Sequence, residues 1–288
     1  MNRHERSRRE FVGWSAAAGL VAATGSSAAA ALEVLEQDVA IRTADGNCDA
    51  AFYHPGKGAH AGVLIWTDIF GLRPVFREFG RRLAASGYSV LVPNPFYRTA
   101  QAPVFGDISS FSFQNEADRA KLPPLVGPLT AAGAVEIDAQ AFIAFLDAQR
   151  QVSKSRKIGT QGYCMGGPLV LRTAAANPER VGAGASFHGG GLVTDKPDSP
   201  HLLIPKLKAH MYFAIAANDD AHQPEAKDTL RTACAAAKVV ADIEVYSGAQ
   251  HGWCVPDMPA QNGAAIYSKP DAERAWTRLL ALYGAALA

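Results

Sequence analysis

Short apolar runs alternate with amphipathic stretches along most of the chain. The clearest run, at 61–66, is continuous and apolar, which is typical of a parallel strand buried on both faces of a sheet. The pattern predicts strands at 36–42, 48–54, 61–66, 89–93, 157–161, 183–187, 210–216 and 242–246. It predicts helices at 75–85, 135–149, 167–177, 225–237 and 271–283. This βαβα order predicts an α/β fold with a single doubly wound, mostly parallel sheet covered by helices.

The segment 99–129 interrupts this order. It mixes Pro, Gly, Ser and Phe without a clear period. Long connections without regular structure are uncommon in compact domains unless they carry a function. We therefore expect a long excursion over the active-site edge of the sheet, as a lid or pocket wall.

The first thirty residues look like a targeting segment. Arg8 and Arg9 stand in Ser7-Arg8-Arg9-Glu10-Phe11-Val12, before a weakly apolar stretch at 13–24 and four alanines at 28–31. This resembles a bacterial twin-arginine signal peptide with cleavage near Ala30, so the mature domain would span 32–288. The resemblance implies recognition by the twin-arginine export machinery and a periplasmic or secreted protein. The alternative is an alanine-rich helical extension.

The apolar stretch of this segment is too short to span a bilayer as a stable helix. We therefore expect no stable membrane association.

Composition favours small-molecule chemistry. The 288 residues include 28 basic and 27 acidic ones for a net charge of +1, so there is no electrostatic footprint for nucleic acid. The cysteines at positions 48, 164, 234 and 254 have neither metal-ligand spacing nor the density of a disulfide scaffold.

A G-x-C-x-G motif lies between a predicted strand and a predicted helix, in Gly162-Tyr163-Cys164-Met165-Gly166-Gly167. An α/β-hydrolase presents its nucleophile on such a strand-turn-helix elbow, and the glycines two residues away on each side permit the tight turn. The alternative is a buried structural cysteine. The context favours Cys164 as a nucleophile.

A thiol at neutral pH is mostly protonated, so it needs a base and a group that orients the base. The strand at 242–246 is followed by His251, and the strand at 210–216 is followed by Asp219 and Asp220. Both loops leave the carboxyl edge of the sheet, where ligand sites of such folds lie. His251 is the predicted base. His188, in a His-Gly-Gly-Gly run after the nucleophile, is at best a pocket residue.

With these residues in place, the chain resembles the dienelactone hydrolase family over most of 35–285. Four separated segments carry the resemblance: Trp66-Thr67-Asp68-Ile69-Phe70-Gly71-Leu72, Pro93-Asn94-Pro95-Phe96-Tyr97-Arg98, the elbow, and the loops of Asp220 and His251. The resemblance implies an α/β-hydrolase fold, no metal or cofactor, and hydrolysis of lactones or esters by a Cys-Asp-His triad through a thioester acyl-enzyme.

The resemblance also assigns the triad. It makes Cys164 the nucleophile, His251 the base and Asp220 the orienting acid, because the family pattern D-x-x-x-P is met by Asp220 to Pro224. Asp219 remains a competitor.

The resemblance further implies that the N–H groups of Ile69 and Met165 form the oxyanion hole. Asp68 stands where the family has an acid, usually glutamate, that contacts the resting thiol. Arg98 matches an arginine that holds the substrate carboxylate, a role suited to its planar guanidinium.

A second carboxylate-binding arginine, expected four residues after the base, is replaced by Val255. Trp253 and Cys254 make this substrate-binding wall more apolar. We therefore expect a small-molecule ester or lactone substrate different from dienelactone.

Three other functions compete with this one. A non-catalytic periplasmic small-molecule binding or sensor protein could keep the same fold, and an esterase could act on neutral esters. A serine-type esterase or peptidase has less support, because no G-x-S-x-G motif occurs.

Overall fold

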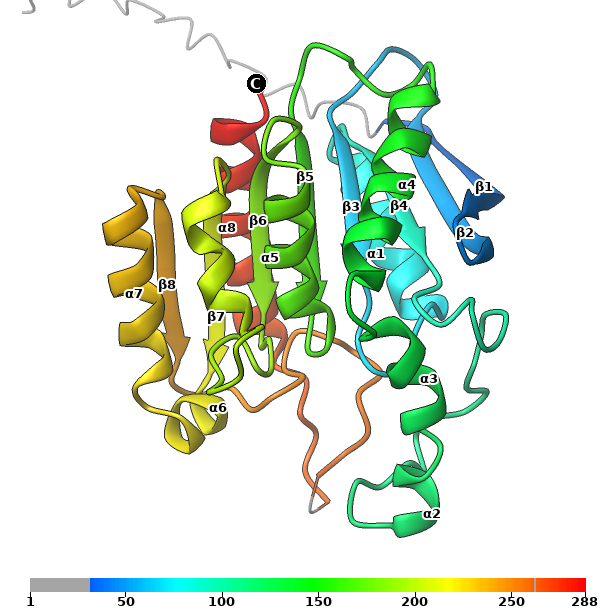
Figure 1. Ribbon diagram of the computed structural model, residues 1–288. Helices are drawn as coiled ribbons and strands as arrows, with labels where there is room; N and C mark the ends of the chain where they lie inside the picture. The colour runs from blue at the N-terminus through cyan, green and yellow to red at the C-terminus, as the bar shows by residue number, and fades with distance from the viewer. Residues whose placement is uncertain (1–31, 262) are drawn as a thin grey trace, which may run out of the picture. The chain divides into compact units, whose positions relative to one another are not determined.

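An eight-stranded sheet runs through the part of the chain that the computed structural model describes, residues 32–261 and 263–288 (Figure 1). The strand order is β1-β2-β4-β3-β5-β6-β7-β8. β2 is antiparallel to both of its neighbours, and all other neighbouring pairs are parallel. The strands are β1 (Val34–Thr43), β2 (Gly46–Pro55), β3 (Gly62–Trp66), β4 (Ser89–Pro93), β5 (Ile158–Tyr163), β6 (Val181–Phe187), β7 (His210–Ala216) and β8 (Ala241–Tyr246). The predicted doubly wound, mostly parallel sheet is confirmed.

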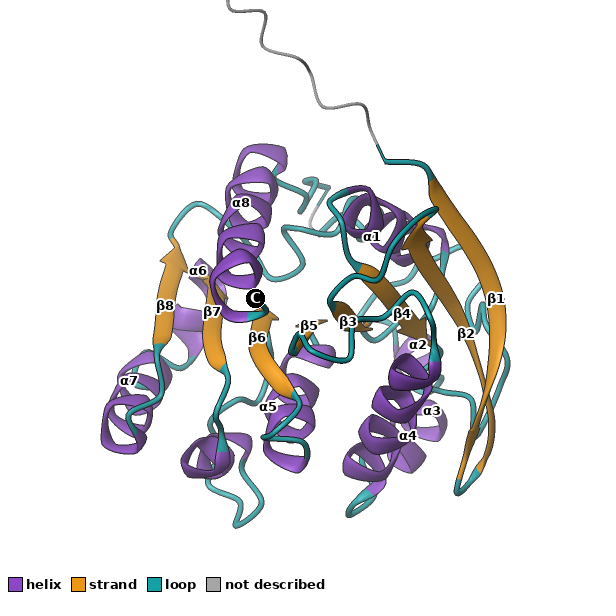
Figure 2. Ribbon diagram, turned by 90° about the horizontal axis from the view of Figure 1, so that it is seen from above, coloured by secondary structure: helices purple, strands orange, loops and turns teal. Residues whose placement is uncertain are grey.

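Helices cover both faces of this sheet (Figure 2). One face carries α1 (Pro74–Ala85) and α8 (Lys269–Ala286), and the other carries α4 (Ala134–Ala148), α5 (Gly166–Ala176) and α7 (Ala226–Ala237). Each layer has its own core of buried side chains. Because both faces are covered, every residue of β3, β4, β5 and β6 is buried, which explains the continuous apolar runs of β3 and β4. β5 and β6 also bury polar side chains, among them Thr160 and Gln161.

All the predicted strands and helices are present, with ends displaced by a few residues. Four short elements were not predicted: α2 (Glu116–Arg119), α3 (Pro123–Leu129), the 3₁₀ helix η1 (Pro200–Lys206) and α6 (Ala217–His222). Of these, α6 matters most for the site, because it replaces the loop expected after β7.

The excursion at 99–129 is not wholly irregular, since it contains α2 and α3. Three of its aromatic rings surround Phe70, with centroid distances of 5.5 Å for Phe105, 5.0 Å for Phe111 and 6.1 Å for Phe113. The excursion therefore packs on the loop that follows β3. Its function as a lid stays a prediction.

The predicted signal peptide at 1–31, with Arg8 and Arg9, lies outside the described residues. Within the described part, no single helix is long and apolar enough to cross a membrane. The segment Glu116–Leu129 passes that test only when joined to α4, across a bend of 69°.

The loops after β3, β5, β6, β7 and β8 meet at one edge of the sheet, because these five strands run parallel (Figure 1). This edge carries Asp68, Cys164, His188, Asp219 and His251. Ligand sites of open α/β sheets lie at this edge.

Candidate active site

Cys164 lies on a sharp turn between β5 and α5. Its φ of +51° is in the left-handed region, which residues with a side chain rarely adopt. Such strain costs about 1–3 kcal/mol and persists only where the surroundings hold it. Here the Cys164 N–H donates to the carbonyl of Phe187 at 3.0 Å, and the Cys164 carbonyl accepts from the N–H of Gly167 at 3.0 Å.

Two glycines make this turn possible. A Cβ at Gly162 would lie 2.1 Å from the carbonyl oxygen of Gly166, and a Cβ at Gly166 would lie 2.6 Å from the carbonyl oxygens of Trp66 and Thr67. The predicted need for small residues two positions before and after Cys164 is therefore confirmed. The thiol itself is half-buried at the sheet edge.

His251 is held by two residues from α6. Its N–H donates to Oδ1 of Asn218 at 2.8 Å. Its Nδ1 lies 2.8 Å from Oδ2 and 3.0 Å from Oδ1 of Asp219. The structure thus brings together a histidine after β8 and an acid after β7, as the strand order predicts.

The predicted choice of Asp220 as the acid beside His251 is wrong. The Asp220 carboxylate accepts a hydrogen bond from Nζ of Lys227 at 2.7 Å, while Asp219 meets His251. Both aspartates lie on α6, where successive side chains point about 100° apart. When one faces His251, the next turns away.

The environment of His251 favours its protonated form. Burial disfavours the charged ring, but hydrogen bonds to Asp219 and to Cys164 outweigh it and raise the pKa of His251 to about 10. At neutral pH the ring therefore carries its proton beside the thiol, where it can stabilise a thiolate.

His188 packs directly against His251. The two ring centroids are 4.9 Å apart with the rings edge to face, and His188 is fully buried. Neither ring nitrogen of His188 has a hydrogen-bond partner among the described residues. Burial, and then the nearby His251, lower the pKa of His188 well below its ordinary value, so the ring is neutral. His188 therefore packs beside His251, a more specific place than the pocket position that the sequence suggested.

The two backbone N–H groups expected to form an oxyanion hole are unoccupied donors. Within residues 32–261 and 263–288, neither Ile69 N–H nor Met165 N–H donates to a protein acceptor. The neighbouring Phe70 N–H is occupied by Oδ1 of Asp68 at 2.9 Å. Ile69 and Met165 follow β3 and β5, which pair directly, so both amides belong to the same edge.

Two cavities lie near the elbow, although neither Cys164 nor His251 is among their lining residues. A cavity of about 370 Å³ between α4 and α5 is bordered by Met165, Gly190 and Gly191. A second cavity, of about 120 Å³, is bordered by Asp219 and the same glycine run. Within the described part of the chain, no group of three or more His, Cys, Asp or Glu side chains is placed to hold a metal ion.

Asp68 is engaged by an arginine. Its carboxylate is fully buried and accepts from Nη1 of Arg73 at 2.7 Å and Nη2 at 2.9 Å. Together with the Phe70 N–H, these are all its hydrogen bonds among the described residues. The expected contact between Asp68 and the thiol of Cys164 is therefore replaced by an ion pair with Arg73.

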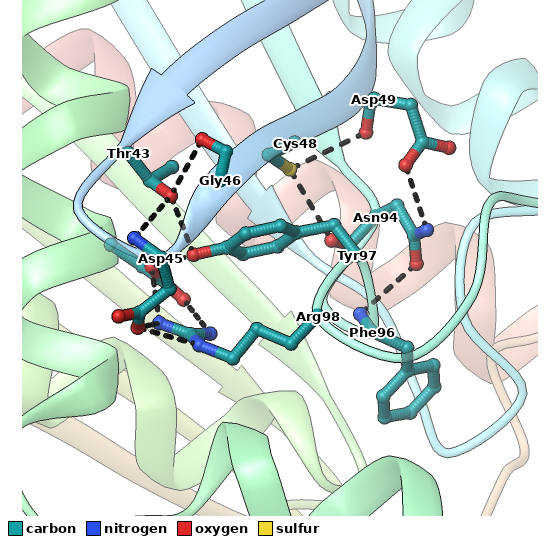
Figure 3. A network of polar contacts seen from close by, with 10 residues as sticks. Thr43, Asp45, Gly46, Cys48, Asp49, Asn94, Phe96, Tyr97 and Arg98 are labelled. Carbon is teal, nitrogen blue, oxygen red and sulfur yellow. Dashed lines mark hydrogen bonds and ion pairs between the residues drawn. The ribbon is translucent and has the colours of Figure 1, made fainter.

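Arg98 is part of a structural network, so the prediction that it holds a substrate carboxylate is wrong (Figure 3). Its guanidinium donates to both oxygens of Asp138, at 2.7 and 2.8 Å, and pairs with Asp45 at 2.7 Å. Asp138 is 0% exposed and also accepts from the hydroxyl of Tyr97 at 2.8 Å. Two carboxylates neutralise the guanidinium and leave it no free charge for a substrate.

The prediction that Trp253 lines the substrate-binding wall is also wrong. Its side chain is 0% exposed and stacks on Tyr246, with ring centroids 4.3 Å apart. Trp253 belongs to the core behind His251. Its large apolar surface is used there for packing.

Sequence reasoning missed three residues of the site. Asn218 holds the backbone of His251, and Arg73 bridges Asp68 to Asp257. Asn218 could have been found from its place beside Asp219. Arg73 lies only five positions from Asp68, but nothing in the local sequence signals Asp257, which is 184 positions from Arg73.

The dienelactone hydrolase family profile matches residues 48–287, which include the elbow and the loops of Asp219 and His251. The chain belongs to the dienelactone hydrolase family. It is accordingly a hydrolase of the dienelactone type.

Curated relatives cover most of the chain. A protein of Methylorubrum extorquens named "Putative carboxymethylenebutenolidase" is 28% identical over 284 residues, which are 95% of this chain and 91% of the relative. A carboxymethylenebutenolidase of Rhodococcus opacus is 26% identical over 230 residues, covering 76% of this chain and 82% of the relative.

A solved structure supports the fold. The dienelactone hydrolase-like promiscuous phosphotriesterase from metagenomic libraries superposes with a TM-score of 0.71 at 22% identity, covering 88% of this chain and 99% of that one. The predicted α/β-hydrolase fold is confirmed.

Proposed function

We propose that the protein hydrolyses a small carboxylic ester or lactone with Cys164 as nucleophile, His251 as acid and base, and Asp219 as the orienting acid. The observation that carries the proposal is the 2.8 Å contact between Nδ1 of His251 and Asp219, next to a cysteine on a nucleophile elbow. Each part of a nucleophile, base and orienter set is present in this arrangement.

The first half of the reaction acylates Cys164. Its thiolate attacks the carbonyl carbon, a carbon–sulfur bond forms, and the carbonyl electron pair moves onto oxygen. The N–H groups of Ile69 and Met165 stabilise this oxyanion, and such donors are worth about 3 kcal/mol each. When the carbonyl re-forms, the carbon–oxygen bond of the ester breaks, and the leaving alkoxide takes the proton of His251.

The second half releases the acid. Neutral His251 removes a proton from water as the water oxygen attacks the thioester, and the same two N–H groups hold the new oxyanion. The carbon–sulfur bond then breaks, the carboxylic acid departs, and the thiolate and imidazolium of the resting pair are restored. With a lactone, the alcohol and acid remain in one open-chain product.

The substrate is proposed to be uncharged next to its ester group. Asp45 and Asp138 already occupy the guanidinium of Arg98, and Val255 stands where a second arginine was expected. An ester that carries a carboxylate therefore has neither expected arginine to pair with. This supports the esterase of neutral esters among the alternatives raised by the sequence.

Export is proposed on the sequence alone. The pair Arg8 and Arg9 and the alanines before residue 32 support recognition by the twin-arginine machinery and a periplasmic or secreted location. The proposed export follows folding. This is compatible with a site whose loops are distant in the sequence and come together only when the chain folds.

Turnover before and after thiol alkylation tests the proposal. The mature chain should release p-nitrophenol from p-nitrophenyl acetate, and iodoacetamide should stop this release as Cys164 becomes labelled. Turnover that survives full labelling of Cys164 would contradict the assignment of the nucleophile. No turnover of any ester or lactone by unmodified protein would favour the non-catalytic binding function.

A further inference from the structure

Arg73 joins the two loops that carry the proposed oxyanion donor and the proposed base. It stands just before α1, and its side chain is only 4% exposed. One edge of its guanidinium faces Asp68, next to Ile69, and the other faces Asp257, in the loop after His251. The mechanism above gives it no role.

Five hydrogen bonds hold the guanidinium: one from Nη1 to the carbonyl of Gly71 at 3.4 Å, and four to carboxylates. Nη1 and Nη2 donate to Oδ1 and Oδ2 of Asp68 at 2.7 and 2.9 Å. Nε and Nη2 donate to Oδ2 and Oδ1 of Asp257 at 2.8 and 2.7 Å. The planar fork of an arginine is suited to such double bidentate pairing, which fixes direction as well as distance.

On the inner side, Asp68 organises the turn that contains Ile69. Its Oδ1 accepts from the N–H of Phe70 at 2.9 Å, and its carbonyl accepts from the N–H of Gly71 at 3.1 Å. The direction of the Ile69 N–H depends on this turn, because the peptide planes on either side of Ile69 belong to it. Arg73 therefore acts on Ile69 through the Asp68 carboxylate.

On the outer side, Asp257 is connected to His251 by successive turns. The N–H of Trp253 donates to Gln250 at 3.0 Å, and the N–H of Val255 donates to Gly252 at 2.9 Å. A segment held by such turns transmits the position of one end to the other. Asp257 thus anchors Arg73 to the loop of the base.

We propose that Arg73 is a positioning residue that keeps the Ile69 N–H at a fixed distance from Cys164 and His251 by tying Asp68 to Asp257. The inference rests on the proposed function, since it concerns the same site. Fixed spacing matters because an oxyanion donor acts only when it lies within hydrogen-bond distance of the developing charge.

The outer carboxylate offers the cleanest variant. Removing Arg73 would leave Asp68 as a buried unpaired charge, which is strongly destabilising. Asp257→Ala leaves the pair of Arg73 and Asp68 intact. Asp147→Ala is the matched control, because Asp147 is also 39% exposed and also pairs with an arginine, Arg180.

The test compares kcat, KM and thiol alkylation in these variants. For p-nitrophenyl acetate, Asp257→Ala should lower kcat about tenfold, less than the loss of a whole oxyanion donor, with KM nearly unchanged. Asp257→Glu should restore part of the loss, and Asp147→Ala should show none. Alkylation of Cys164 by iodoacetamide forms no oxyanion, so its rate should stay the same in all variants.

Three outcomes would overturn the inference: an unchanged kcat in Asp257→Ala, an equal fall in Asp147→Ala, or a fall matched by slower alkylation of Cys164. Failure of the proposed function is distinguishable, because it appears in the wild-type chain as normal alkylation without turnover of any ester. That result would remove the inference together with the function.

Discussion

Replacing Asp219 with asparagine should impair turnover far more than the same change at Asp220. The two aspartates are adjacent in the chain and about equally exposed, at 29% for Asp219 and 24% for Asp220. They differ in partner, because Asp219 meets Nδ1 of His251 and Asp220 meets Lys227. Asp220→Asn is therefore the matched control for Asp219→Asn.

The size of the effect follows from these partners. A hydrogen bond to a charged group contributes about 1.5–3 kcal/mol, and asparagine offers His251 only a neutral amide in its place. Loss of the charged contact should lower kcat/KM by roughly ten- to 150-fold. The half-buried pair of Asp220 with Lys227 lies away from His251 and touches none of the proposed reacting groups. Asp220→Asn should therefore change kcat/KM less than about twofold.

The pH dependence gives a second readout with a defined sign. The hydrogen bond to Asp219 is among the interactions that outweigh burial and raise the pKa of His251 to about 10. Removing the negative charge lowers this pKa. Because the resting pair needs a protonated His251, the alkaline limb of the kcat/KM profile should move to lower pH in Asp219→Asn.

Release of p-nitrophenol from p-nitrophenyl acetate, followed from neutral to alkaline pH, measures both effects. A larger loss in Asp220→Asn than in Asp219→Asn would refute the geometric argument. An alkaline limb that stays in place would refute the role of the His251 charge.

Three further predictions concern the nucleophile, the arginine network and export. Cys164→Ala should abolish hydrolysis of p-nitrophenyl acetate while the unfolding temperature stays nearly unchanged, because the thiol is half-buried and its role is chemical; retained turnover would contradict this. Arg98→Ala should lower the free energy of unfolding by about 3–5 kcal/mol, since it leaves Asp138 as a buried unpaired charge. Its kcat/KM should change equally for matched acid and methyl-ester substrates, and a loss confined to the acid would show substrate pairing instead. Replacing Arg8 and Arg9 with lysines should leave precursor in the cytoplasm on cell fractionation, and efficient export would count against the twin-arginine proposal.

The elbow could be predicted because its determinants are local. Gly162 and Gly166 lie two positions on either side of Cys164, so the motif itself reveals them. A side chain at Gly162 would clash with the carbonyl of Gly166, and one at Gly166 would clash with the carbonyls at the end of β3. The loop of His251 could be predicted for a different reason, since parallel strands bring their following loops to one edge. Both inferences use only strand order and neighbours in sequence.

The choice between the two aspartates could not be made in this way. It depends on α6, a helix of six residues whose phase decides which carboxylate faces His251. The D-x-x-x-P pattern that favoured Asp220 depends only on the spacing of residues along the chain. It carries no information about which side chain of α6 faces His251. A helix of this length also has too few apolar positions to reveal its period.

The arginines were unpredictable because their partners are remote. Arg98 and Asp138 are 40 positions apart, and Arg73 and Asp257 are 184 positions apart. An arginine in a loop can bind a substrate or close a structural network. Only the tertiary contacts distinguish these two uses.

In the proposed mechanism, Cys164 carries the acyl group during turnover. Rapid quenching of the protein with p-nitrophenyl acetate, followed by proteolysis and mass spectrometry, tests it directly. We expect an acetyl group on the peptide that contains Cys164, sensitive to hydroxylamine as a thioester is, and absent from Cys164→Ala. An acetyl group on a serine peptide, or steady turnover with no acylated Cys164 under any quench condition, would contradict it.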